Sequence, residues 1–270
     1  KEKKIGTAYI TATAKDGSGA FARCKVRVVR KVTKITLNKY TAKLLVGKTL
    51  KLKAKVHPKK ATIKSVAWSS SDNSIATVDA SGRVQGLAAG MVKIRAKAKD
   101  GSGKSAVCLI TVSDPIPATG VDVTNNDLIV AKGRQIQSGI TIAPSNSTDK
   151  IKYYSDNPAV ARINKRGKIY ANRVGQATVY GETSNGQVGY ADVLVVTLNR
   201  RSLPLRLYDT ETLRVNEIST GVTWHSQNPL IASVDSTGKV VGRRRGVTRI
   251  YATVRGLKLS CKVTVSDING

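Results

Sequence analysis

The stretch WSSSDNSIATVDASGRVQGLAAG, residues Trp68–Gly90, decides the fold because it recurs twice further along the chain. The other copies are YYSDNPAVARINKRGKIYANRVG at Tyr153–Gly175 and WHSQNPLIASVDSTGKVVGRRRG at Trp224–Gly246. In every copy a glycine follows the leading aromatic residue by 14 positions, and a second glycine comes 8 positions later. A fixed spacing in three copies indicates a repeated structural unit.

Each unit has the sequence pattern of short strands. Residues 49–56 (TLKLKAKV) alternate strictly between polar and apolar, which predicts one strand with one buried and one wet face. Asp100-Gly101 is a favoured hairpin turn between two further alternating segments. Turn signals recur every 8–12 residues and no helical period is present. The first unit therefore predicts about seven short strands in an all-β sandwich.

The repeats divide the chain into four parts. Residues 1–30 are expected to be the last two strands of a preceding unit, because Gly6 and Cys24 match Gly90 and Cys108 at the same offset of 84. Three domains are then expected at residues 31–114, 115–199 and 200–270. Residues 114–117 (DPIP) form a short, stiff linker before the second domain.

The third unit is expected to be shortened. Its Leu205-Arg-Leu207 and Glu217 are aligned with Val121-Asp-Val123 and the turn glycine Gly133. That alignment leaves about 13 residues missing before Trp224, enough for one strand and its loop. A sheet edge without its neighbour favours assembly by strand addition, as does the hairpin expected at 1–30.

Each unit offers one aromatic residue and one small residue for its core. Trp68, Tyr153 and Trp224 are expected to pack between the sheets; the alternative, sugar stacking, would require exposed rings. Cys108 and Cys261 begin equivalent segments, and Ala191 holds that position in the middle unit. We therefore interpret these cysteines as buried apolar residues rather than as disulfide or metal-ligating residues.

The chain is strongly basic, with 46 Lys and Arg against 17 Asp and Glu and a net charge of +29. Such a charge favours acidic partners such as teichoic acid or an acidic host glycan. The alternative is that the basic residues only form a solvated surface. Alternation puts the charges of Lys51, Lys53 and Lys55 on one exposed strand face, as it does for the basic residues within 93–99, and such charges oppose edge-to-edge aggregation.

Arg243, Arg244 and Arg245 form a separate basic group, because a loop tip with three guanidinium groups suits phosphate or sulfate. Nucleic acid is not favoured as the target, because no aromatic residues interleave the basic runs.

Catalysis is not expected. His57 and His225 are the only histidines, they occupy different places in their units, and no acid, base and nucleophile recur together. No metal or cofactor is expected either. No stretch approaches 18 apolar residues, so membrane insertion is not expected.

The repeated residues resemble the bacterial Ig-like domain, group 2. The segments that carry the resemblance are Ile35–Asn38, Val46–Leu50, Val66–Ser70, Ile75–Asp79, Gly82–Gly86 and Gly90, with Val222–Ser226, Ile231–Asp235 and Gly238–Gly242 in the third copy. The resemblance implies tandem immunoglobulin-like β-sandwiches with no conserved catalytic site. Such domains serve as stalk or adhesive segments of exported proteins, including intimin- and invasin-like adhesins, and occur in some phage particle proteins.

We therefore expect a non-enzymatic stalk or adhesion segment at the bacterial cell surface, which packs against neighbouring Ig-like modules and spaces a terminal functional region from the envelope. The alternatives are a basic binding module that docks on an anionic polymer, and a phage particle protein.

Overall fold

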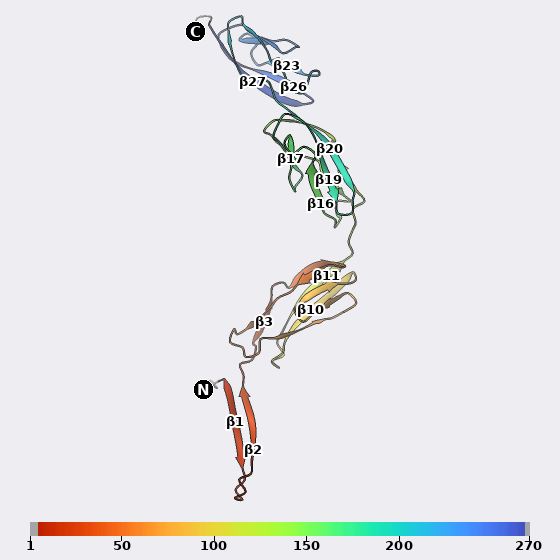
Figure 1. The fold of residues 1–270 in the computed structure, drawn as a ribbon, viewed down its shortest axis with the longest axis vertical. Helices are drawn as coiled ribbons and strands as arrows, with labels where there is room; N and C mark the ends of the chain where they lie inside the picture. Colours follow the sequence, from red (N-terminus) through yellow and green to blue (C-terminus); the bar gives the residue numbers. More distant parts are fainter. Residues whose placement is uncertain (1–4, 268–270) are drawn as a thin grey trace. The chain divides into compact units, whose positions relative to one another are not determined.

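The computed structural model describes residues 5–267, and every regular element in that range is a β-strand (Figure 1). The all-β class is therefore confirmed. The chain divides into two compact units, residues 1–115 and 116–270, which are described separately.

The first unit contains a hairpin followed by a sandwich. The hairpin consists of β1 (Gly6–Thr13) and β2 (Phe21–Val28). The sandwich strands are β3 (Lys34–Leu37), β4 (Thr41–Leu45), β5 (Thr49–Lys51), β6 (Ala54–His57), β7 (Val66–Ser70), β8 (Ala76–Val78), β9 (Arg83–Gly86), β10 (Gly90–Ala98) and β11 (Ser105–Ser113). They form the sheets β4-β11-β10-β7, β5-β9-β8 and β3-β6. Leu52, Ile94 and Ile110 are fully buried between them.

The sandwich has more strands than the sequence predicted, for two reasons. The segment 49–56, predicted as one strand, is split: β5 pairs with β9, whereas β6 pairs with β3. The chain changes sheets at Leu52, whose amide donates to the Gly82 carbonyl at 2.8 Å. Burial still alternates through the crossing, so the pattern is correct and the single strand is wrong. Strand β4, which was not predicted, pairs in parallel with β11.

The hairpin repeats the pairing of β10 and β11 without their surroundings. Ile10 pairs with Cys24 as Ile94 pairs with Cys108. Ile94 is fully buried, however, whereas Ile10 is 62% exposed. Within residues 5–267 neither outer edge of the hairpin is paired with another strand. The assignment of these residues to a preceding unit, and assembly by strand addition, stay predictions; residues 1–4 lie outside the described range.

The second unit contains two further sandwiches. The middle one comprises β12 (Gly120–Val123), β13 (Asp127–Ala131), β14 (Gln135–Gln137), β15 (Ile140–Ala143), β16 (Ile151–Ser155), β17 (Ala161–Ile163), β18 (Lys168–Ala171), β19 (Gly175–Thr183) and β20 (Val188–Val196). The last one comprises β21 (Ser202–Arg206), β22 (Thr210–Thr212), β23 (Thr223–Ser226), β24 (Ala232–Val234), β25 (Lys239–Gly242), β26 (Gly246–Val254) and β27 (Leu257–Ser266). Their large sheets, β13-β20-β19-β16 and β21-β27-β26-β23, repeat the order of the first sandwich.

Packing of the aromatic ring on the turn explains the 14-residue spacing. Gly82 has φ +82°, and a Cβ there would lie 2.8 Å from the Trp68 ring and 2.7 Å from the Leu52 carbonyl oxygen. Gly238 faces Trp224 in the same way, and Gly167 faces Tyr153 at 3.2 Å. Only glycine leaves room for the ring and accepts this backbone conformation.

The later glycine of each repeat has a similar steric origin. At Gly90, where φ is +155°, a Cβ would meet the Ile75 side chain at 2.7 Å. The equivalent approaches are 3.3 Å from Gly175 to Val160 and 3.0 Å from Gly246 to Ile231. The apolar residue that opens each alternating segment therefore packs directly on the glycine that begins the next long strand.

The third sandwich corrects the alignment proposed for Leu205–Leu207. Strand β21, which contains Leu205, pairs in parallel with β27, as β4 pairs with β11. Tyr208 then takes the place of Gly47, because its amide donates to Gly242 as that of Gly47 donates to Gly86. Tyr208 has φ +70°, so a non-glycine residue occupies this left-handed position. The alignment of Glu217 with Gly133 is wrong.

The loss of chain in the third sandwich is smaller than predicted. Gly47 precedes Trp68 by 21 residues and Tyr208 precedes Trp224 by 16, so five residues are missing rather than about 13. The pairing of β3 with β6 is reduced there to one bridge, between Leu198 and Val215. The third sandwich is also shorter in the turn between its two long strands, which comprises residues 255–256 where the first sandwich has residues 99–104.

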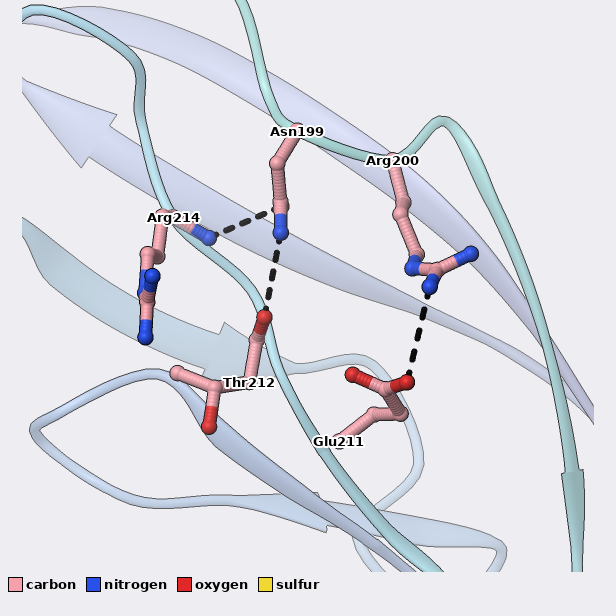
Figure 2. A network of polar contacts seen from close by, with 5 residues as sticks. All are labelled: Asn199, Arg200, Glu211, Thr212 and Arg214. Carbon is pink, nitrogen blue, oxygen red and sulfur yellow. Dashed lines mark hydrogen bonds and ion pairs between the residues drawn. The ribbon is translucent and has the colours of Figure 1, made fainter.

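Asn199 shows where the third sandwich begins (Figure 2). Its side-chain amide donates to the Thr212 carbonyl at 3.1 Å, and its Oδ1 accepts from the Arg214 amide at 2.9 Å. Asn38 ties the Lys51 carbonyl and the Lys53 amide in the same way. Residues 196–199 are thus the counterpart of 35–38. Arg200 and Glu211 form an ion pair beside this clamp, at 3.5 Å.

The two sandwiches of the second unit share strand β20. Val193 and Val195 belong to the middle core. Leu194 and Val196 point to the opposite face and, with Leu198, belong to the core of the third sandwich. Consecutive residues of one strand therefore serve two cores, and the third core draws on residues before position 200.

Asp79 organises the turn after β8. Its Oδ1 accepts from the Ser81 amide, the Ser81 hydroxyl and the Arg83 amide at 2.7–2.9 Å. Asp235 does the same in the third sandwich, and Asn164 accepts from two amides in the middle one. The hydroxyl of Ser81, followed by the Arg83 amide, lowers the pKa of Asp79 below 3.8, and Thr237 and Lys239 act likewise on Asp235.

Gly82→Ala is expected to destabilise the first sandwich by about 3 kcal/mol, because left-handed strain adds to a clash with Trp68. Gly101→Ala is the matched control: its φ is +73°, but no atom lies within 4 Å of the added Cβ. The control is expected to lose only about 1 kcal/mol. Amide hydrogen exchange of β10 and β11 reports the loss domain by domain. Equal losses in both variants would show that the ring contact contributes nothing.

Acid is expected to loosen the turns of Asp79 and Asp235 selectively. A carboxyl whose pKa is lowered by folding stabilises the fold above its unfolded value, and that contribution disappears as pH falls through the folded pKa. The window therefore lies below about pH 4. Amide exchange at Arg83 and Lys239 should accelerate there relative to Lys168, whose acceptor is Asn164. Asp79→Asn should remove the difference at Arg83; an unchanged pH dependence would refute the assignment.

Candidate binding surface

The three predicted arginines lie together on one exposed loop between β25 and β26. The Arg243 and Arg244 amides both donate to the Ile231 carbonyl, at 2.8 and 3.1 Å, which fixes the loop backbone. The Arg243 side chain reaches the Ser233 hydroxyl at 3.1 Å, and Arg245 pairs with Asp267 at 3.4 Å. The loop is therefore a small, exposed basic patch, and Asp267 partly offsets its charge at Arg245.

Larger basic surfaces lie on the outer faces of two of the four-stranded sheets. In the first sandwich Lys93, Arg95 and Lys97 of β10 alternate with the buried residues Val92, Ile94 and Ala96 and are all exposed. In the third sandwich Arg249 of β26 and Lys262 of β27 are directly opposite each other on that face. Three ion pairs occur in residues 5–267, so most of these cations have no carboxylate partner within that range.

The same face of the middle sandwich has different chemistry. Tyr154, Tyr180 and Tyr190 lie opposite one another on β16, β19 and β20. The equivalent rows are Ser69, Arg95 and Val107 in the first sandwich and His225, Tyr251 and Ser260 in the third. Sequence analysis did not single out this row. Each tyrosine does fall at an outward-facing position of the alternating pattern in its strand. The pairing register of the three strands was needed, however, to show that the tyrosines are neighbours.

The aromatic and cysteine residues predicted for the cores lie at or in those cores. Trp68, Tyr153 and Trp224 are half-buried and pack against their respective clusters. The Tyr153 hydroxyl donates to the Ile140 carbonyl at 2.9 Å. Cys108 and Cys261 are fully buried, and burial raises the pKa of the Cys261 thiol to about 11. A thiol held protonated in this way is a poor nucleophile.

Neither histidine lies in a group of catalytic residues. His57 contacts the Thr36 hydroxyl through Nε2 at 3.2 Å, and His225 lies on an exposed outer face. In the part of the chain from residue 5 to 267, no three His, Cys, Asp or Glu side chains are grouped to hold a metal ion. The same residues include no helix with the length and apolar character needed to cross a membrane.

Comparison with known proteins gives two informative relatives. An uncharacterized protein of Clostridium acetobutylicum is 32% identical over 154 residues, which cover 57% of this chain and 15% of that protein. An Ig-like virion protein of Serratia phage KSP90 is 30% identical over 171 residues, or 62% of this chain and 66% of that protein. The chain thus spans less than two thirds of the length of either relative.

Among solved structures, the bacterial integrin-binding protein invasin aligns over 97% of this chain and 65% of its own, with 12% identity and a TM-score of 0.36.

The family is shown by a sequence model. The model of the bacterial Ig-like domain (group 2) matches residues 31–108 and 117–191, more than half of the chain. Domains of this family occur in extracellular, surface and phage virion proteins and are generally non-catalytic. The repeated glycines, the aromatic residue of each unit and the sandwich topology agree with the match. The chain belongs to the bacterial Ig-like domain (group 2) family.

Proposed function

We propose that this chain is a structural stalk or adhesion segment of a bacterial surface protein, which spaces a terminal functional region from the envelope. The supporting observation is the joint between the middle and third sandwiches. A spacer transmits position only if its modules do not pivot freely, and short connections with shared packing restrict pivoting.

The joint has no linker. Val196 is the last residue of β20, where it is opposite Ala131 in the middle sheet. Its side chain is fully buried in the core of the third sandwich, with Leu198 next to it. Ile129 and Ala131 of β13 pack against the same core. Bending at this point would expose apolar surface, at a cost of about 25 cal/mol per Å².

A polar contact reinforces the joint. One guanidinium nitrogen of Arg255 contacts both carboxylate oxygens of Asp127, at 2.6 and 2.7 Å, and links the β26–β27 turn to β13. The side chains of Arg255 and Asp127 are 48% and 63% exposed, so the pair contributes at most about 1 kcal/mol. The pair therefore sets orientation, and the apolar contacts supply most of the stability.

The spacer role predicts that the two sandwiches orient as one body. Residual dipolar couplings measured for residues 116–267 within the full chain should fit one alignment tensor. With Gly-Ser-Gly-Ser inserted between Val196 and Thr197, the couplings should require two alignment tensors. The insertion separates strand β20 from the rest of the third sandwich, so the two sandwiches can reorient independently. Two tensors in the unmodified chain would refute the rigid joint.

Spacing itself is measured with the chain placed between a surface anchor and a reporter peptide on a cell. Capture of the reporter by a large bead should exceed that given by a flexible linker of equal residue number. The insertion variant should fall between them, and equal capture in all three would contradict a spacer function.

Binding of an anionic polymer is a second candidate, favoured by the basic outer faces of the first and third sandwiches. Retention on immobilised heparin or teichoic acid should fall with rising salt, since screening weakens exposed charge pairs. Changing Arg243, Arg244 and Arg245 to Ser should reduce retention. Changing Lys93, Arg95 and Lys97 to Ser gives the loss of retention due to the sheet face, for comparison with the loss due to the loop. Absence of retention at low salt would reject this candidate.

A structural role in a phage particle is the third candidate, supported by the similarity to the Ig-like virion protein. Both settings use the fold as a non-catalytic module. Localisation of the native protein with an antibody, on cells or on purified particles, separates the two.

A further inference from the structure

From the outer face of the middle sandwich we infer a binding site for a neutral oligosaccharide, centred on Tyr190 and the groove next to it. The inference is independent of the spacer role. It starts from a contrast: each sandwich exposes the outer face of its four-stranded sheet, and only the middle sandwich has a row of three tyrosines there.

The tyrosine row leaves one ring surface open. Tyr154 and Tyr180 stack on each other, with ring centroids 5.0 Å apart and planes at 13°. Tyr190 is tilted by 42° from Tyr180 at 6.2 Å and remains 54% exposed. On its other side the chain that leads into β13 reaches β20 at Asn126, whose carbonyl accepts from the Asp192 amide at 2.8 Å, and regular pairing begins with Asp127 and Asp192. With 54% of its surface exposed, the Tyr190 side chain is available to a ligand.

Polar groups line a groove directly next to this row. It has a volume of about 440 Å³ and is lined by Asp127, Asp156, Gln176, Ala177, Thr178, Asp192, Val193, Leu194 and Arg255. Asp156, Thr178 and Asp192 each lie two residues along their strand segments from a tyrosine of the row, and therefore on the same side of the sheet. Two residues cover about 7 Å of strand, which brings the ring and the carboxylates within reach of one ligand.

The carboxylates of Asp156 and Asp192 are held in place by hydrogen bonds and can accept further ones. Asp192 Oδ1 accepts from the Thr178 hydroxyl at 2.8 Å, and Asp156 Oδ1 accepts from the Thr178 amide at 2.8 Å. These bonds use one oxygen, Oδ1, of each carboxylate. An ionised carboxylate can accept hydrogen bonds at both of its oxygens. Fixed acceptors beside an exposed ring suit a ligand with several hydroxyl groups and an apolar C–H face, which is the chemistry of a sugar ring.

The local charge selects a neutral ligand. The face and groove carry Asp127, Asp156, Asp192 and Glu182 against Lys150, Lys152 and Arg255, four acidic groups against three basic ones, although the chain as a whole is at +29. An anionic polymer is therefore less favoured on this face than on the outer faces of the other two large sheets. A protein partner would be expected to cover a broader apolar surface than one open ring beside a charged groove.

The test is titration of the full, isotope-labelled chain with maltohexaose, cellohexaose and chitohexaose, followed by amide chemical shifts. At least one should shift the amides around Tyr190 and Asp192, with a dissociation constant that is unchanged between low and high salt. Tyr190→Ala should weaken that binding at least tenfold, and Asp192→Asn, which keeps the size of the side chain, should also weaken it. Tyr9→Ala removes a tyrosine of matched exposure, 57%, and should have no effect.

Three outcomes would overturn the inference: no shifts with any of the three sugars, binding that Tyr190→Ala leaves intact, or shifts confined to the basic sheets. Because loss of Tyr190 weakens the tyrosine row, the amide spectrum of each variant must first show the native fold. Asp192→Asn carries the test if Tyr190→Ala does not fold.

Discussion

The fold depends on the contact between one aromatic ring and the backbone of one glycine turn in each unit. At Trp68 the ring occupies the space where any other residue at position 82 would place its Cβ, and the Leu52 amide bonds the Gly82 carbonyl beside it. Leu52 lies where the chain passes from one sheet to the other. Ring, turn and crossing point are thus fixed together, which joins the two layers of the sandwich at one place.

Much of the fold could be predicted from sequence because local pattern and tertiary contact agree. The alternation at residues 49–56 matches the observed burial, and the spacing from Trp68 to Gly82 reflects a direct contact. The strand change at Leu52 could not be predicted, because alternation is indifferent to which sheet receives the hydrogen bonds. The misalignment of the third unit has a comparable cause: Tyr208 adopts the left-handed conformation expected of glycine, so the residue that marks the turn elsewhere is missing there.

Surface chemistry and core packing are independent in this family member. The inward positions of the three large sheets are nearly interchangeable, as shown by Cys108, Ala191 and Cys261 at equivalent, fully buried sites. The outward positions vary much more, from lysine and arginine in the first sandwich to tyrosine and aspartate in the middle one. Candidate binding residues could be predicted only where they adjoin in sequence, as at Arg243–Arg245. The tyrosine row required the pairing of three strands separated by up to 36 residues.

The parallel strand pair in each sandwich has a mechanical consequence. Strands β4 and β11 lie near opposite ends of the first sandwich sequence and pair in parallel over five residues, as β13 with β20 and β21 with β27 do in the others. When tension pulls the two ends of a module apart, these strands slide past each other along their length. All bonds of the patch are then loaded at once, in shear, rather than broken one after another as in unzipping. Each sandwich should therefore resist stretching until all the hydrogen bonds between its two parallel strands fail together.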